Sequence, residues 1–207
     1  MTRVPAMRTL ENALRRVGFM HVAGVDEVGR GCLAGPVVAA AVVLHPDRHI
    51  AGVADSKAVP AAERERLYER ILSHAIAWAV ADADPAEIDR INIHQASLRA
   101  MQRAVLALAP LPDIVLVDAF RVPELPMAQR GVLHGDRRCA AIAAASIIAK
   151  VTRDRRMMEL HARDPLYGFD RHNGYATADH LDAVARHGYS EIHRRSFRPP
   201  TLFDTMD

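Results

Sequence analysis

Acidic side chains at the ends of apolar, strand-like segments are the residues of this sequence best suited to chemistry. Asp26 and Glu27 end the first such segment, and Asp118 ends the apolar run 114–117. Binding sites in open α/β sheets form at strand ends. A single acid in this position is more often a cap or a solvated loop residue, but two adjacent carboxylates rarely end a strand without a counter-ion.

A helix predicted over residues 140–161 offers a fourth acid. Asp154 follows Ser146 and Lys150 at helical spacing. If this helix packs beside both strands, four carboxylates meet, and their mutual repulsion raises their pKa values. Divalent cations relieve such repulsion, and oxygen ligands without His or Cys favour Mg²⁺ or Mn²⁺. Two such ions about 4 Å apart can activate water and stabilise the leaving oxygen of a phosphodiester. That all four acids meet is an assumption about topology, because spacing alone does not establish it.

A glycine-rich segment, residues 29–35, follows the first pair of acids. It matches the loose dinucleotide-binding fingerprint, with Ala34 at the third glycine position. That fingerprint requires a helix next, whereas Pro36 and the β-branched run 37–44 predict a strand, which disfavours a dinucleotide site. The alternative is that the small residues let the backbone lie against a sugar or phosphate, with Arg30 adding positive charge.

The hydrophobic pattern predicts the elements that position these residues. Strands are expected over 21–26, 37–44, 76–81, 113–118 and 131–134, and helices over 9–16, 63–75, 91–108, 140–161 and 177–187. The first two strands form a hairpin, a turn begins at Asp84-Pro85, and 166–175 is a loop. No repeat or linker interrupts the chain, so we expect one α/β domain over 1–198 and a flexible tail over 199–207.

Composition excludes several classes of protein. Of the 207 residues, half are apolar and a quarter are charged, as in a globular domain, and the net charge of +2 neither requires nor excludes a nucleic-acid partner. Cys32 and Cys139 lie too far apart for a disulfide framework or a zinc site, and two free thiols suit the cytoplasm. The apolar runs are too short to span a membrane. Only two lysines, Lys57 and Lys150, stand among 27 basic residues, each beside Asp and Ser, which a GC-rich genome explains as readily as function does.

Several short motifs occur in order along the chain. They are 24–31, 34–37, Asp55-Ser56-Lys57, 91–97, 115–118, Gly135-Asp136, 142–155, 167–175 and 193–197. Each alone is weakly specific, but the ordered set, which covers about residues 20–198, resembles the ribonuclease HII family.

The resemblance implies a ribonuclease H-like fold: a mixed five-stranded sheet flanked by helices, with a helical C-terminal extension. It implies an endonuclease that hydrolyses the RNA strand of RNA–DNA hybrids and cuts at single ribonucleotides embedded in duplex DNA. A two-metal mechanism with Mg²⁺ or Mn²⁺, in which water attacks in line, would leave 5′-phosphate and 3′-hydroxyl ends. The expected partners are these nucleic acids, with no membrane, and the expected state is a monomer.

The resemblance also implies roles for individual residues. The catalytic and metal-binding carboxylates map onto Asp26, Glu27, Asp118 and Asp154, with Asp26 bridging the metals. Substrate-binding positions map onto Gly29, Arg30, Gly31, Lys57, Ser146, Lys150 and Tyr175. Within that set the Gly-Arg-Gly loop reads the ribose 2′-hydroxyl, which distinguishes RNA from DNA, and the tyrosine senses the RNA–DNA junction by stacking. Without the resemblance, Tyr175 would be interpreted as a packed core aromatic.

Departures from the family pattern are also visible. Ala119-Phe120 stand where the family usually has Gly-Asn, Asn173 where it often has Lys, and Ala176 where it often has Gly or Pro. They leave substrate affinity and metal preference open. The late run Arg194, Arg195 and Arg198 could contact phosphate, although a solvated face is the commoner interpretation, and the late histidines are expected to be structural or solvated.

Two other functions stay open. A non-catalytic hybrid-binding module is disfavoured because four acids facing phosphates would hinder binding. A nucleotide-cofactor oxidoreductase would require a helix directly after Ala34.

Overall fold

A computed structural model describes residues 6–197, so the expected tail over 199–207 lies outside the described residues. The strands are β1 (Val22–Val28), β2 (Val37–Leu44), β3 (Ala75–Ala83), β4 (Ile114–Asp118) and β5 (Ala128–Val132). The helices are α1 (Thr9–Arg16), α2 (Ala61–His74), α3 (Pro85–Ile91), α4 (Ile93–Leu106), α5 (Gly135–Arg138), α6 (Ala140–Arg163), the 3₁₀ turn η1 (Pro165–Tyr167), α7 (Phe169–His172) and α8 (Ala178–His187).

The five strands form one mixed sheet in the order β3-β2-β1-β4-β5. β1, β2 and β3 pair antiparallel in sequence order, whereas β4 lies parallel to β1 and β5 parallel to β4. This arrangement confirms the expected hairpin and the mixed five-stranded sheet. The glycine-rich segment over residues 29–35, called the glycine loop below, is followed by a strand, β2. A dinucleotide site would need a helix there, so the oxidoreductase hypothesis is wrong.

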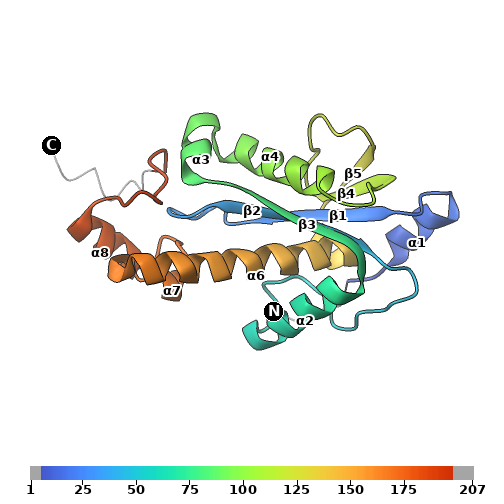
Figure 1. The fold of residues 1–207 in the computed structure, drawn as a ribbon, viewed down its shortest axis with the longest axis horizontal. Helices are drawn as coiled ribbons and strands as arrows, with labels where there is room; N and C mark the ends of the chain where they lie inside the picture. Colours follow the sequence, from blue (N-terminus) through green and yellow to red (C-terminus); the bar gives the residue numbers. More distant parts are fainter. Residues whose placement is uncertain (1–5, 198–207) are drawn as a thin grey trace.

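Successive strand residues point to opposite sides of the sheet. Both faces carry apolar side chains, and helices cover both of them. Figure 1 shows α6 along one face and α4 along the other. Val22 packs with α6 and α2 in one core cluster, while Ala23 and Val25 pack with α4 in another. Gly24 lets α6 approach β1 closely: a Cβ at this position would lie 2.2 Å from the carbonyl carbon of Ala141. The site residues on β1 are therefore held directly against the start of α6.

Two elements predicted between residues 84 and 134 differ in the structure. Asp84 and Pro85 begin a helix, α3, and not merely a turn: the Asp84 carboxylate caps the helix by accepting from the Glu87 N–H at 2.7 Å. The last strand spans Ala128–Val132 and not 131–134, because it is defined by parallel pairing with β4 and not by an apolar pattern.

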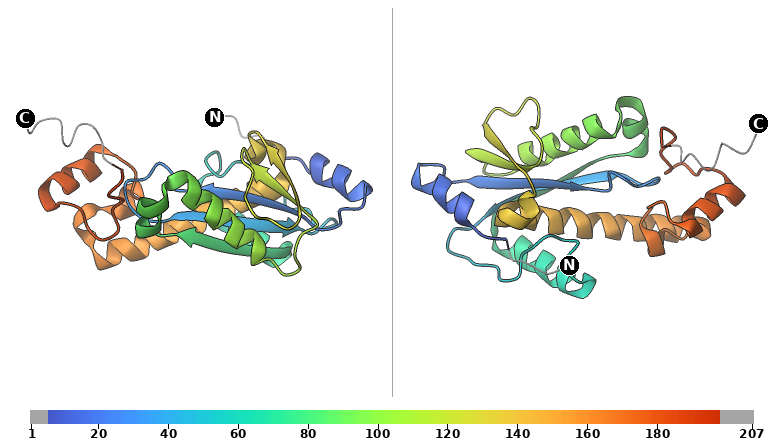
Figure 2. Two further views of the ribbon diagram at one scale, coloured as in Figure 1. Left: turned by 90° about the horizontal axis from the view of Figure 1, so that it is seen from above. Right: turned by 180° about the vertical axis from the view of Figure 1, so that it is seen from behind.

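The expected helical C-terminal extension lies at the far end of α6, as Figures 1 and 2 show. It contains η1 and α7, in the segment predicted as a loop, followed by α8. As predicted, Thr177 caps α8 and Gly188 ends it. Cys32 and Cys139 are buried free thiols. Among the described residues, no helix has both the length and the apolar composition needed to cross a membrane.

Candidate active site

Parallel pairing of β1 and β4 brings two of the candidate acids together. Val25 pairs with Val117, so the next residue of each strand, Asp26 and Asp118, lie side by side where β4 ends. The backbone N–H of Gly135 donates to Oδ1 of Asp118 at 2.7 Å and fixes this carboxylate. A cavity of about 350 Å³ opens at this strand end. Its lining comprises Asp26, Glu27, Val28, Gly29, Arg30, Gly31, Ser56, Lys57, Asp118, Asp136, Ser146 and Tyr175.

The carboxylates in this cavity lack a matching number of cations. Burial raises the pKa of Asp26 well above its ordinary value, and the negative charges of Glu27 and Asp118 raise it further. Burial also raises the pKa of Glu27, although Arg30, whose Nη1 lies 3.3 Å from Glu27 Oε1, opposes this change. A buried group of oxygen ligands with excess negative charge is the environment that hard divalent cations stabilise.

Asp154 does not lie in this cavity. Lys150 Nζ is 2.7 Å from its Oδ1, and Arg64 Nη1 is 3.4 Å from its Oδ2. Its negative charge contributes to raising the pKa of Tyr175, which lines the cavity, although burial is the main cause. Within residues 6–197, no three His, Cys, Asp or Glu side chains are already arranged to hold a metal ion. The structure thus groups three of the four predicted acids, while Asp154 and Lys150 form their own ion pair.

The segment Asp55-Ser56-Lys57 forms one wall of the cavity. Buried Asp55 accepts from the Lys57 N–H at 3.0 Å, and its other oxygen lies 3.4 Å from Arg137 on α5. The hydroxyl of Ser146, on α6, donates to that of Ser56 at 2.7 Å. These contacts place Lys57 and Ser146 in the lining of the cavity.

The glycine loop, residues 29–35, contributes Gly29, Arg30 and Gly31 to the lining. Gly29 has φ +91°, a conformation that favours glycine, and a Cβ at Gly31 would meet no atom within 4 Å. The Arg30 guanidinium lies over the ring of Phe120, 4.7 Å from its centroid. Phe120, where the family usually has Asn, therefore holds the Arg30 side chain beside Glu27.

Tyr175 belongs to the cavity and not to the core. Tyr175 is 39% exposed, so the interpretation as a packed core aromatic, made without the resemblance, is wrong. The backbone of Tyr175 forms an isolated antiparallel bridge with Cys32, which joins it to the glycine loop. An exposed ring beside this loop is suited to stacking on a sugar or base.

One lining acid, Asp136, was not assigned a role from the sequence. Burial raises its pKa, as do the nearby charges of Asp55 and Asp118. The sequence signal for this residue is the Gly135-Asp136 pair, one of the motifs that carry the family resemblance.

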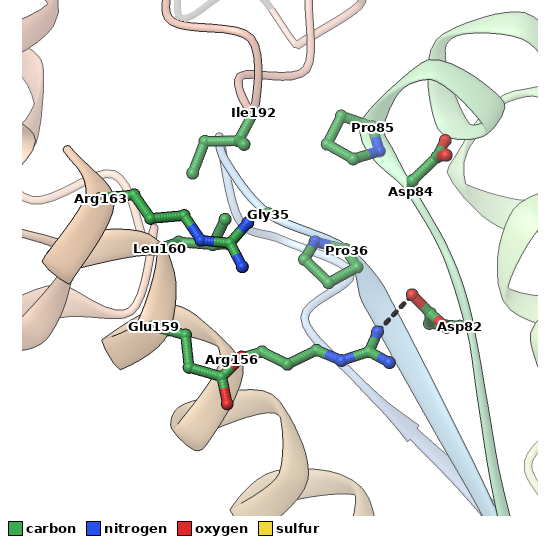
Figure 3. A pocket seen from close by; sticks show the side chains of 10 residues that line it. All are labelled: Gly35, Pro36, Asp82, Asp84, Pro85, Arg156, Glu159, Leu160, Arg163 and Ile192. Atoms are coloured by element: carbon green, nitrogen blue, oxygen red, sulfur yellow. Dashed lines mark hydrogen bonds and ion pairs between the residues drawn. The ribbon is translucent and has the colours of Figure 1, made fainter.

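A second cavity, of about 280 Å³, lies behind the glycine loop. Figure 3 shows Arg156 on α6 reaching across it to Asp82 on β3, beside Gly35 and Pro36. Its acidic side chains are mixed with arginines, and it contains none of the predicted site residues. The carboxylate cavity is therefore the candidate active site.

Comparisons with known proteins cover this whole region. A family model described as Ribonuclease HII matches residues 23–199. The chain is 54% identical over 178 residues to ribonuclease HII of Burkholderia pseudomallei strain 1710b, spanning 86% of this chain and 83% of that protein. It is 51% identical over 193 residues to ribonuclease HII of Bacillus cereus strain Q1, spanning 93% and 75%.

Solved structures show the same fold. Ribonuclease H2 from Pyrococcus horikoshii OT3 aligns with a TM-score of 0.74 and 27% identity, covering 86% of this chain and 94% of that one. Ribonuclease HII from Archaeoglobus fulgidus, solved in complex with PCNA, aligns with a TM-score of 0.74 and 26% identity, covering 87% and 96%. The expected ribonuclease H-like fold is confirmed.

Proposed function

Because this chain belongs to the ribonuclease HII family and is a ribonuclease H-type endonuclease, we propose that it cuts both RNA–DNA hybrids and single ribonucleotides embedded in duplex DNA. The observation that carries this proposal is the cavity in which Asp26, Glu27 and Asp118 face the glycine loop. Carboxylates supply a place for cations on the scissile phosphate, and the loop supplies a backbone surface close enough to test for a 2′-hydroxyl.

We propose Asp26, Glu27 and Asp118 as the ligands of two divalent cations, Mg²⁺ or Mn²⁺. Their all-oxygen donor set and the raised pKa values of Asp26 and Glu27 fit hard cations. When bound, such cations would polarise the phosphodiester and stabilise charge on its leaving oxygen. Asp154, the fourth ligand, would join by exchanging its contacts with Lys150 and Arg64.

The remaining lining residues position the substrate in this proposal. Gly29, Arg30 and Gly31 contact the ribose, and the exposed Tyr175 ring stacks at the junction between RNA and DNA. Lys57 also lines the cavity, and its ammonium group would contact a phosphate. Hydrolysis would leave 5′-phosphate and 3′-hydroxyl ends.

The test is cleavage of an end-labelled DNA duplex that contains one ribonucleotide, with Mg²⁺ or Mn²⁺ titrated. We expect a single nick that a DNA polymerase extends, since extension requires a 3′-hydroxyl. Asp26→Asn removes the charge of a proposed ligand and is expected to abolish the nick, whereas Asp182→Asn, at an exposed side chain of α8, serves as the matched control. Cleavage by Asp26→Asn at the wild-type rate would contradict the proposed site.

The assay also separates the alternative function. Tight binding of an RNA–DNA hybrid, without cleavage at any concentration of either cation, would favour a non-catalytic binding module.

A further inference from the structure

Two arginines are completely buried beneath the glycine loop, at 0% exposure each: Arg153 on α6 and Arg194 in the segment after α8. Neither forms an ion pair with any acid in the described part of the chain. Both instead donate to backbone carbonyl groups. Arg194, from a run that the sequence indicated to be solvated, is therefore an internal structural cation.

The guanidinium of Arg194 bonds three times to the glycine loop. Its Nη2 donates to the carbonyl oxygen of Gly29 at 2.6 Å, its Nη1 to that of Arg30 at 2.9 Å, and its Nε to that of Gly35 at 3.0 Å. Burying a charge without a counter-ion is costly, and here burial lowers the pKa of Arg194 to about 10. The planar fork of an arginine fits three fixed acceptors, which the compact ammonium of a lysine does not.

These bonds determine which way the loop amides face. In a trans peptide, the C=O of one residue and the N–H of the next point in opposite directions. Because the carbonyls of Gly29 and Arg30 point at Arg194, the N–H groups of Arg30 and Gly31 point away from it. Neither N–H donates a hydrogen bond to any residue that the structure describes. Both residues line the candidate active site, so these two donors face the cavity.

The segment that carries Arg194 is itself fixed, by the end of the glycine loop and by α3. The Arg194 N–H donates to the carbonyl of Leu33 at 2.8 Å, and the Gly35 N–H donates to that of Ile192 at 2.8 Å. Farther along, the carboxylate of Asp89 on α3 accepts from the N–H groups of residues 195 and 196, at 2.8 and 2.9 Å. The guanidinium is thus held in one position relative to the loop.

We propose that Arg194 is a positioning residue, which aims the N–H groups of Arg30 and Gly31 at the ribose of the substrate. This proposal rests on the proposed function for the identity of the substrate. It predicts that loss of the guanidinium weakens recognition of the ribonucleotide and leaves the carboxylate site intact.

The first test measures the loop without substrate. Arg194→Lys keeps the buried charge but loses the three-pronged contact. Hydrogen–deuterium exchange of the peptides covering residues 29–35 is expected to rise at least about tenfold in rate, while the core strands stay protected. Arg186→Ala, which removes an exposed arginine of α8, is the matched control and is expected to leave exchange unchanged. Unchanged exchange over 29–35 in Arg194→Lys would overturn the proposal.

The second test uses the single-ribonucleotide duplex. Arg194→Lys is expected to raise KM about tenfold with little change in kcat, and Mn²⁺ affinity measured by calorimetry is expected to match the wild type. Added guanidinium ion is expected to restore cleavage by Arg194→Ala but not to stimulate the wild type. Equal losses in metal affinity and KM would indicate general damage and refute a positioning role. If Arg194→Ala does not fold, the lysine variant decides the question.

The two tests distinguish the two proposals. Failure of the wild type to cut the duplex would refute the proposed function, while the exchange experiment would still decide whether Arg194 holds the loop.

Discussion

Acidification from pH 7 to pH 5 is expected to destabilise the folded protein through one buried imidazole, that of His193. Its Nδ1 accepts from the Ser190 N–H at 3.0 Å, and its Nε2 lies 3.0 Å from Nε2 of His180. The Nδ1 of His180 lies 2.9 Å from the carbonyl oxygen of Tyr175. Because a carbonyl only accepts, His180 donates from Nδ1 and accepts at Nε2, so His193 donates from Nε2. A second proton on either ring would therefore break a hydrogen bond.

The size of the effect follows from the pKa of His193. Burial, and then the neighbouring His180 and His172, lower this pKa from 6.5 to about 4. The unfolded chain therefore binds the proton first, and stability is lost as the pH falls from 6.5 towards 4. The loss is about 2 kcal/mol at pH 5 and about 3 kcal/mol below pH 4. In a domain of this size, 2 kcal/mol corresponds to a decrease in Tm of about 4–8 °C.

Urea unfolding of the wild type and of His193→Gln at pH 7 and pH 5 measures this contribution. Glutamine keeps an N–H donor for His180 but does not titrate. The comparison is needed because other buried groups also titrate: the lowered pKa of His180 adds to the loss, whereas the raised pKa of Asp26 opposes it. We expect the wild type to lose about 2 kcal/mol more than the variant. Equal losses in the two proteins would refute the assignment to His193.

Two further substitutions test the backbone that carries the site. Gly24→Ala is expected to lower the free energy of unfolding, measured with urea, by about 3 kcal/mol, because the added Cβ would clash with the backbone of α6 at Ala141. An unchanged urea midpoint would contradict this close approach. Ala119→Gly is expected to stabilise the protein by about 1 kcal/mol, because Ala119 has a left-handed φ of +57°. Asn173→Gly, at φ +49°, is the matched control with a smaller expected gain, since asparagine tolerates this conformation.

The strands and helices that border the core could be predicted because burial imposes a recognisable apolar pattern on their sequences. β2 spans Val37–Leu44 as expected, since a strand covered on both faces reads as a continuous apolar run. β5 was misplaced because its residues are mostly exposed, and its existence depends on pairing with β4. Asp84-Pro85 is compatible with both a turn and a helix start, and only the helix that follows distinguishes them.

The position of Asp154 shows where spacing supports two outcomes. Lys150 lies four residues before it on α6, which is the spacing of an ion pair on one helix as well as of a shared site. The structure forms the ion pair, at 2.7 Å, and adds Arg64 from α2, which no local pattern could place there. Asp26 and Asp118, in contrast, meet because β1 and β4 pair in parallel, and the sequence analysis could only assume that these two strands are neighbours.

The negative charge of the candidate site is not balanced by the basic residues around it. Among residues 6–197, Arg30 is the one cation within ion-pair distance of Asp26, Glu27 or Asp118, and it contacts only Glu27. Arg153 and Arg194 lie beneath the same loop, but their donors are taken by carbonyl groups, so their fork-shaped contacts shape the backbone and do not neutralise Asp26 or Asp118. A nearly neutral chain can therefore maintain a negatively charged cavity next to two buried arginines. Because the charge of that cavity is not balanced from within the fold, binding of divalent cations is expected to stabilise the protein, and Tm should rise with Mg²⁺ or Mn²⁺ in the wild type but less in Asp26→Asn.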